Sequence, residues 1–334
     1  LPDLSKENVP QYKVQVDEAM VAEEVEKLRT RYGNMTEPEA VAADENVLNV
    51  TFVETDANGN HIEGGIKKEN SLLLKYFKES FRPNLLGKKK DDIIQLKLDD
   101  AFEGQEKEWV VNDLGIDGAS DKNFKLILTK IGLIEPRELN EEFFTQLFPN
   151  EEVKTEQAFR QRIKDELQKQ WDVESKNQLH HSLWHVLLDR TQIDFPQDFL
   201  KRWIKTQGEN KQPKTDEEVE REFPQFLNQL KWTLLTDKIS HQNVIQIGPD
   251  EIRQFAKQQL LGYMGMQALD EDQQWVRDYI DRMMKDKKYV EDAYNRMQTQ
   301  KIFEWAESQV NAVETPISKE EFIKMNEAHQ HHHH

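Results

Sequence analysis

The sequence predicts an α+β protein in which a small antiparallel β-rich domain is attached to the tip of an elongated all-α domain with helical arms. Nine of the thirteen glycines lie between residues 33 and 132, which confines turn-rich structure to one block. From Leu139 onward, apolar residues recur at the spacing of an α-helix. Charged residues make up 32% of the chain and hydrophobic residues only 37%, against about 25% and 45–50% in an average globular protein. We therefore expect an extended shape with much surface.

The first 44 residues are predicted to form a linker strand and a helix that pack on the C-terminal domain. Residues 12–16 alternate as a strand does, and a helix is expected over residues 17–31. The apolar side chains of this helix form one narrow stripe: Val21, Val25 and Leu28. A single short helix of this kind is not stable alone, so it needs a partner within residues 139–334.

Residues 45–136 are predicted to form the β-rich domain. Three short runs there alternate or are rich in β-branched side chains, at residues 47–54, 93–98 and 124–131. The sequence from Asp56 to Asn60 contains the Asn-Gly pair that is typical of a hairpin turn. These features indicate antiparallel strands.

Residues 137–328 are predicted to be helical. Thr215 with Glu218, and Ser318 with Glu321, have the spacing of capping boxes, in which a hydroxyl accepts from a free amide of the first turn. Pro224 is expected to start, break or kink a helix. Residues 329–334 are interpreted as a purification tag remnant or a disordered tail, with a natural histidine-rich metal tail as the alternative.

The composition argues against several classes of function. A net charge of −18 would repel a phosphate backbone, so we expect no direct nucleic-acid binding by this part of the protein. With no cysteine there is no disulfide or thiolate site, which fits a reducing compartment and favours a cytoplasmic location. No apolar run approaches the roughly 18 residues that span a bilayer, and no membrane partner is expected. The start at Leu1 is neither an initiator methionine nor a signal peptide, so the sequence is expected to begin inside a longer gene product.

One group of histidines has a spacing that a metal ion could use. His181 and His185 stand four residues apart, on one face of a predicted helix, and His180 precedes them. No third ligand is evident nearby in the sequence, so a structural or solvent-facing role is the favoured interpretation. Neither a phosphate-binding glycine loop nor a nucleophile elbow occurs. We therefore predict no metal site and no cofactor.

An ordered series of short motifs resembles the trigger factor family along nearly the whole chain. The strongest stretch is residues 136–148, which reads Pro-Arg-Glu-Leu-Asn-Glu-Glu-Phe and ends in Leu147 and Phe148. Residues 194–199 and 317–322 resemble later landmarks of the family, and residues 62–65 resemble the opening of its FKBP-like domain. No counterpart of the family's ribosome-docking loop is present. The resemblance implies a piece that lacks the ribosome-binding domain, so ribosome contact is expected only through that absent domain.

The resemblance also implies a prolyl-isomerase pocket, and here the sequence departs from the family. The expected Ile-Pro-Gly-Phe-Glu segment is missing between Leu74 and Gly87, and Asp100 to Gly104 replaces another family motif. Isomerases of this type work by binding geometry in an aromatic pocket. We therefore expect a degenerate FKBP-like domain with no confident catalytic residue; the pocket candidates are Phe52, Ile62, Tyr76, Phe77, Phe81, Phe102 and Phe124.

Methionines gather near the C-terminus, where six of the eight lie in the last 71 residues. Thioether side chains adapt to irregular partners, so apolar side chains in this region are candidates for contacts with unfolded chains. The predicted client-binding set is Leu260, Leu261, Tyr263, Met264, Met266, Met283, Met284 and Met297. Ordinary core packing is the alternative for each methionine.

Three functions remain open from the sequence. The first is an ATP-independent chaperone, or holdase, that binds unfolded or nascent polypeptides. The second is an active peptidyl-prolyl isomerase that acts on the same clients, where the barrier to rotation is about 18–20 kcal/mol. The third is an envelope chaperone with a similar helical body, which a signal peptide upstream of Leu1 would favour.

Overall fold

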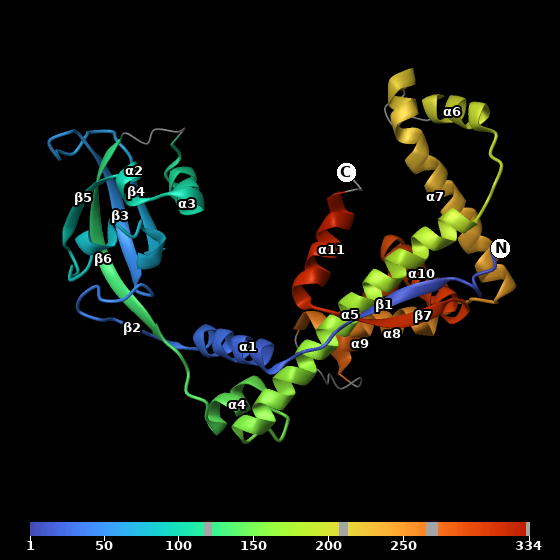
Figure 1. Ribbon diagram of the computed structural model, residues 1–334, viewed down its shortest axis with the longest axis horizontal. Helices are drawn as coiled ribbons and strands as arrows, with labels where there is room; N and C mark the ends of the chain where they lie inside the picture. Colours follow the sequence, from blue (N-terminus) through green and yellow to red (C-terminus); the bar gives the residue numbers. More distant parts are fainter. Residues whose placement is uncertain (117–121, 207–212, 265–272, 332–334) are drawn as a thin grey trace. The chain divides into compact units, whose positions relative to one another are not determined.

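The computed structural model describes residues 1–116, 122–206, 213–264 and 273–331 (Figure 1). The chain divides into two compact units. The helical unit comprises Leu1–Gln15 and Gln168–His334, and the sheet unit comprises Val16–Leu167. One long helix, α5 (Glu156–Arg190), contributes residues to both units. The fold class is α+β, as the sequence predicts. The domain boundaries expected from the sequence, and the placement of the β-rich domain at a tip, stay predictions.

The sheet unit is built on a five-stranded antiparallel sheet, with strands in the order β2-β6-β3-β4 and with β5 also paired to β6. Strand β6 lies in the middle because its 13 residues pair with β3, β5 and β2 in turn. The strands are β2 (Asn34–Thr36), β3 (Val47–Thr55), β4 (Lys67–Leu73), β5 (Ile93–Lys97) and β6 (Asn123–Glu135). The helices of this unit, besides the start of α5, are α1 (Glu18–Arg31), α2 (Leu98–Ala101), α3 (Gly104–Leu114) and α4 (Glu141–Leu147), with short 3-10 turns η1 (Leu74–Tyr76) and η2 (Arg82–Asn84).

Local sequence signals explain several of these boundaries. Helix α1 begins after Asp17, whose Oδ1 accepts a hydrogen bond of 2.9 Å from the Met20 amide. The helix ends before Gly33, where a Cβ would lie 2.5 Å from the Glu135 carbonyl oxygen, so only glycine fits there. The predicted turn after β3 is present, because the amide of Gly59 donates to the Asp56 carbonyl at 3.1 Å and Gly59 has a φ of +84°.

The chain segment that leads into the sheet and the segment that leaves it lie side by side, at Arg29 and Arg137. The backbone amide of Arg137 donates to the Arg29 carbonyl at 3.0 Å, and the Arg29 Nε returns a bond of 2.6 Å to the Arg137 carbonyl. Val21 and Val25 on α1 are buried, as are Phe143 on α4 and others on α4 and α5. The narrow apolar stripe of α1 is therefore covered.

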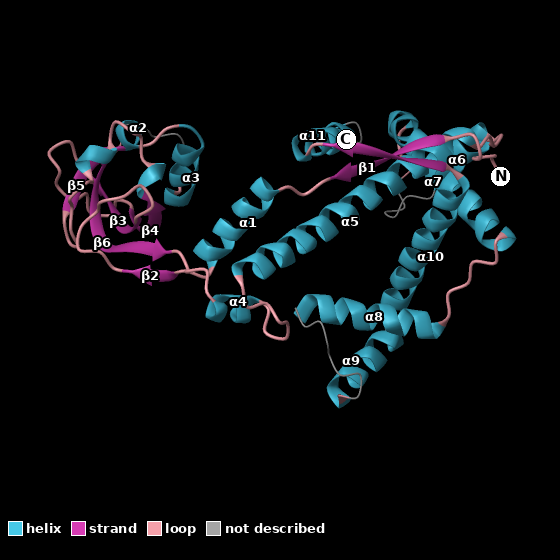
Figure 2. Ribbon diagram, turned by 60° about the horizontal axis from the view of Figure 1, so that its bottom comes forward, coloured by secondary structure: helices cyan, strands magenta, loops and turns pink. Residues whose placement is uncertain are grey.

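The helical unit contains a two-stranded parallel sheet, in which β1 (Asn8–Val14) pairs with β7 (Asn311–Ile317) over seven residues (Figure 2). Its remaining helices are α6 (Gln197–Thr206), α7 (Asp216–Gln242), α8 (Pro249–Met264), α9 (Gln274–Lys285), α10 (Lys287–Gln309) and α11 (Lys319–His331). The capping box of Thr215 and Glu218 is formed at the start of α7. Helix α7 continues through Pro224, so the helix neither starts nor ends at that residue.

Strand β7 lies in a region that the sequence indicates as helical only. Its residues are mostly exposed, and Pro316 has no amide hydrogen to donate to a partner strand. Its strand form therefore depends on β1, which lies about 300 residues earlier in the chain. No sequence pattern within residues 311–317 predicts that pairing.

Hydrophobic clusters among the described residues hold the helical unit together. The largest is formed by β1, α5, α7 and α10, and its buried members are Leu4, Val9, Leu179, Leu183, Leu187, Leu235, Ile239, Ile302, Ala306 and Val310. A second joins α8 to α9 through Leu260, Val276 and Ile280. A third joins α6 to α7 through Ile204, Val219 and Phe223. The small size of the last two clusters leaves much of α6 to α9 in contact with solvent.

Candidate functional site

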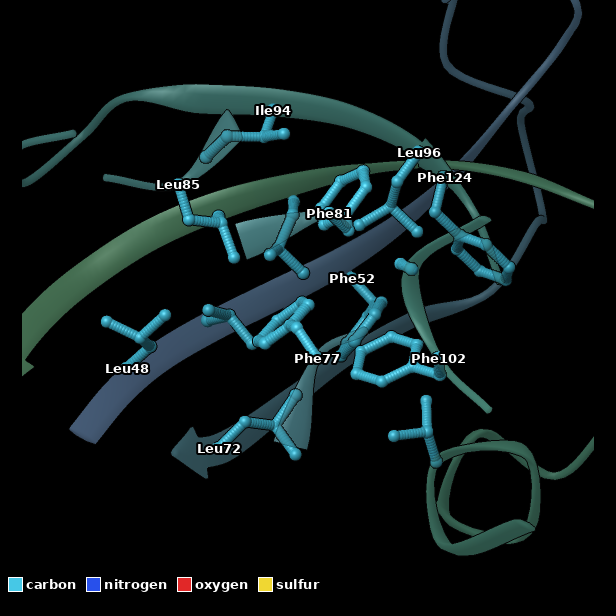
Figure 3. Close-up of a cluster of buried hydrophobic side chains, with 14 of the residues drawn as sticks. Leu48, Phe52, Leu72, Phe77, Phe81, Leu85, Ile94, Leu96, Phe102 and Phe124 are labelled. Carbon is cyan, nitrogen blue, oxygen red and sulfur yellow. The ribbon is translucent and has the colours of Figure 1, made fainter. Parts of the chain in front are cut away.

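Five of the seven pocket candidates are buried in the core of the sheet unit, where they pack on one another (Figure 3). The rings of Phe77 and Phe102 have centroids 4.6 Å apart, and those of Phe77 and Phe81 are stacked at 6.0 Å. Phe52 meets Phe124 edge-on at 6.0 Å. Because each ring has its faces covered by other core side chains, a proline ring could stack there only by displacing them.

The other two candidates lie apart from this cluster. Ile62 is 38% exposed, in the connection between β3 and β4. Tyr76 packs at the edge of the core and meets Trp109 on α3 edge-on, with centroids 5.9 Å apart. The structure therefore does not bring the seven residues together as the lining of one pocket.

A shallow hollow of about 480 Å³ lies on the surface of the same unit, beside the Phe77 to Phe81 segment. Its lining is polar and charged: Lys78, Glu79, Ser80 and Glu103. Such a lining offers no apolar side chain on which a proline ring could stack. The sheet unit thus presents stacked aromatic side chains inside and charged side chains at this hollow.

The predicted client-binding set divides into two kinds of position. Leu260 is buried between α8 and α9, and Leu261 and Met284 pack against the same cluster. Met283 and Met297 are partly buried. Tyr263, in contrast, is 93% exposed near the end of α8. Met266 and the side chain of Met264 lie outside the described residues.

Exposed aromatic side chains on α6 form a surface that sequence reasoning missed. Phe199 is 58% exposed and Trp203 is 46% exposed, one helical turn apart. Their neighbours Leu200 and Ile204 pack on α7. The ring of Trp203 also contacts Phe226 of α7, with centroids 6.0 Å apart, and leaves the rest of its surface exposed. Two adjacent apolar stripes on one ten-residue helix are more than a single packing face needs, and this doubling is the signal that could have identified the surface.

Further large apolar side chains are exposed on the other helices of the unit. Those from α7 to α10 are Leu234 on α7, Val244 in the loop that follows α7, Trp275 on α9 and Tyr294 on α10, and Val173 on α5 and Ile323 on α11 are exposed as well. Together with Phe199, Trp203 and Tyr263, those from α7 to α10 define what we call the scattered apolar surface. Charged side chains stand between them, and ion pairs join neighbouring helices, for example Lys205 to Asp216 at 2.7 Å and Lys301 to Glu251 at 2.7 Å. These lysines lower the pKa of the Asp216 and Glu251 carboxyl groups.

His180 belongs to the interior of the helical unit. Its ring stacks on Phe303 with centroids 5.0 Å apart, and its Nε2 lies 3.5 Å from an oxygen of Glu307. Burial lowers the pKa of this imidazole below its usual value, although Glu307 opposes that effect. His180 therefore has a structural position in the core.

Neither a cluster of metal ligands nor a membrane-spanning helix is found among the described residues. In the described parts of the chain, no three or more histidine, cysteine, aspartate or glutamate side chains are gathered to hold a metal ion. Among the helices in the same parts, none combines the length and the apolar character needed to cross a membrane.

The fold and these surfaces define a class of protein that combines an FKBP-like β domain with a helical domain exposing separate apolar patches. Residues 35–136 match the family model "Probable trigger factor, FKBP-like domain", and residues 175–326 match "Probable trigger factor, C-terminal domain". The chain belongs to the trigger factor family.

Curated relatives and a solved structure agree with this assignment. The trigger factor of Chlorobaculum tepidum is 23% identical over an alignment of 273 residues that covers 78% of this chain and 60% of the relative. That of Chloroherpeton thalassium is 24% identical over an alignment of 294 residues that covers 82% of this chain and 65% of the relative. A structure from work on "Promiscuous Substrate Recognition in Folding and Assembly Activities of the Trigger Factor Chaperone" has a TM-score of 0.52 at 17% identity, covering 91% of this chain and 71% of that one. The chain thus spans less than two thirds of the length of the first two relatives.

Proposed function

We propose that this protein is an ATP-independent chaperone that holds unfolded or nascent polypeptides. Membership of the trigger factor family supports the proposal. The observation that carries it is the scattered apolar surface on α6 to α10, which exposes large side chains at separate points of an otherwise charged unit.

Separate small patches suit a client that has no fixed shape. Complete burial of one large apolar side chain is worth about 1.5–3 kcal/mol, so a contact at Phe199 or Tyr263 alone is weak and reverses quickly. Several such contacts along one flexible client add up by raising its effective concentration at the remaining patches. The surface therefore supports binding that tolerates many sequences and releases its client without a nucleotide.

The charge of the protein fits the same function. With a net charge of −18, the protein stays soluble while it exposes apolar side chains, and it attracts basic unfolded chains at long range. We propose the cytoplasm as its location, because the absence of cysteine fits a reducing compartment.

Suppression of aggregation tests the proposal. A chemically denatured client is diluted into buffer without nucleotide, and light scattering is followed at increasing amounts of this protein. We expect scattering to fall as the protein reaches a few-fold molar excess. Unchanged scattering at a large excess would contradict the chaperone assignment.

A pair of variants locates the binding surface. The double substitution Phe199→Ser and Trp203→Ser removes two exposed side chains of α6, and we expect it to raise the concentration needed for half suppression by about threefold or more. The matched control is Val173→Ser, which removes an exposed apolar side chain on α5 outside the scattered apolar surface. Equal suppression by the double variant and the control would exclude α6 from the binding surface.

A further inference from the structure

We propose that the outer edge of strand β7 binds an extended segment of a client polypeptide as an added strand, with a preference for segments that carry lysine or arginine. This contact belongs to the proposed chaperone function, on which the inference rests, and it engages the main chain of the client. Strands β1 and β7 form a two-stranded sheet (Figure 2), so each strand has one edge toward its partner and one edge away from it.

The hydrogen bonds between the two strands decide which main-chain groups of β7 point away from β1. The strands are parallel, and the Asn311 amide donates to the Glu7 carbonyl at 2.9 Å. In a strand, the amide and the carbonyl of one residue point to the same edge, and successive residues alternate between the two edges. Asn311 and every second residue after it therefore bond to β1. Ala312, Glu314 and Pro316 direct their main-chain groups outward.

The outer edge of β1 is covered by α5. The same alternation turns the carbonyls of Tyr12 and Val14 away from β7. The Ser175 hydroxyl donates to the Tyr12 carbonyl, and the Gln168 Nε2 donates to the Val14 carbonyl at 2.9 Å. Pro10 lies on this edge as well and has no amide that needs a partner. An added strand therefore cannot pair with β1 without displacing α5.

The outer edge of β7 has no such cover in the described part of the chain. There, no hydrogen bond is formed to the outward main-chain groups of Ala312, Glu314 or Pro316, and all three residues are exposed. The outward groups are the amides of Ala312 and Glu314 and the carbonyls of all three. Such a row of donors and acceptors is complementary to the main chain of another extended segment.

Two residues of this edge set the strength and the preference of the contact. Pro316 offers a carbonyl but no amide, so full pairing is confined to Ala312 and Glu314, and the contact is short and readily reversed. Glu314 is the single charged residue of β7 and is exposed. An opposite charge on a neighbouring strand is favourable and a like charge is unfavourable. With a net charge of −18 for the chain, a basic client segment fits this edge better than a second copy of β7 does.

A labelled peptide measures the contact with the full chain by fluorescence anisotropy. The peptide has the length of β7 and alternates valine with lysine. We expect an otherwise identical peptide with an N-methyl group on every internal amide to bind at least about tenfold more weakly, because it has lost its main-chain donors. A peptide with glutamate in place of lysine should bind about threefold more weakly or worse. Equal affinity of the unmodified and the methylated peptides would overturn the main-chain contact, and equal affinity for lysine and glutamate would overturn the charge preference.

Variants at one residue locate the contact on β7. Glu314→Pro removes an outward amide and leaves the hydrogen bonds between β7 and β1 in place. We expect it to weaken binding of the valine–lysine peptide by about three- to tenfold. Glu314→Gln is the matched control, because it keeps the amide and removes only the charge, and it should weaken binding by a smaller factor. Circular dichroism checks that each variant is folded.

Hydrogen exchange of the unaltered protein tests the same edge without any substitution. Followed by NMR, exchange of the Ala312 and Glu314 amides should slow when the valine–lysine peptide is bound. Unchanged exchange of both amides, or full affinity in a folded Glu314→Pro protein, would overturn the proposal. Slow exchange that appears without peptide as the protein concentration rises would also overturn it, because a second copy then occupies the edge.

The chaperone proposal is measured separately, by light scattering of an aggregating client. If the protein suppresses aggregation while the peptide leaves β7 unaffected, the strand contact alone is wrong. If the peptide protects Ala312 and Glu314 while aggregation proceeds unchanged, the strand contact stands and the chaperone proposal is wrong.

Discussion

Phe77 is an aromatic residue that the family resemblance makes a candidate for a substrate pocket, but in the structure it is a core residue. Its ring is 1% exposed and contacts Phe81 and Phe102, so it packs the core where the resemblance implies a substrate pocket. We expect Phe77→Ala to lower the free energy of unfolding of the sheet unit by about 3–5 kcal/mol, measured by denaturant titration. Ile62→Ala, at an exposed position, should change it by less than about 0.5 kcal/mol. Similar small effects for both would mean that Phe77 is not part of the packed core.

His180 gives a second prediction at the scale of one residue. Burial lowers the pKa of its imidazole in the folded protein, so the unfolded chain takes up the proton first as the pH falls. Its contribution to stability is present above the ordinary value of about 6.5 and is lost as the pH drops below it. We expect the protein to lose more stability between pH 7.5 and pH 5.5 than the variant His180→Phe does.

A denaturant series at the two pH values measures that difference. The many carboxylates of the chain contribute equally to the protein and the variant, so the difference isolates His180 and the Glu307 side chain beside it. His241→Phe, at an exposed histidine of α7, serves as the control. Equal pH dependence in the protein and in His180→Phe would contradict this account.

Helix α1 illustrates an element whose start the sequence predicts correctly. The Asp17 side chain caps the helix through the Met20 amide, so Asp17→Ala should cost about 0.5–2 kcal/mol of stability. Asp17→Asn keeps an oxygen that accepts the same bond and should cost much less. Thermal unfolding of the two variants compares them, and equal losses would show that the cap is not the cause.

The FKBP-like sheet gives a prediction about catalysis at the scale of elements. Because the aromatic rings between its strands and its short helices cover one another, we expect residues 45–136 to catalyse little prolyl isomerisation within the full chain. A protease-coupled assay on a proline-containing peptide measures the rate. A rate near that of an intact FKBP-like domain would show that the packed rings open to admit substrate.

Local patterns predict elements better than they predict what covers them. The turn after β3, the cap of α1 and the capping box of α7 follow from a few neighbouring residues, and each is present. Strand β7 was missed because its form depends on a distant partner. The exposure of Phe199 and the burial of Phe77 also depend on neighbours far along the chain. An apolar pattern therefore identifies a packing face but not the segment that packs against it.

For the whole molecule, we predict that the sheet can be deleted without unfolding the helical unit, because the segments that enter and leave the sheet lie side by side. Because Arg29 and Arg137 are hydrogen-bonded neighbours, a short linker can close the chain after residues 45–134 are removed. We expect the shortened protein to fold and to suppress aggregation of a denatured client, since the scattered apolar surface lies outside the deleted range. Circular dichroism and light scattering measure both properties. A deletion protein that aggregates would show that the helical unit depends on the sheet.

The pairing of β1 with β7 has a consequence for the order of events during synthesis. Strand β1 is made about 300 residues before its partner, Asn311–Ile317. The sheet unit is contiguous, from Val16 to Leu167, and can be completed while the ribosome is still translating the later helices. The helical unit has to wait until β7 emerges, which at about 5–20 residues per second is about 15–60 s after β1 has left the tunnel. During that interval β1 has an unpaired edge, so this protein depends on other protection at the very stage at which we propose that it protects its clients.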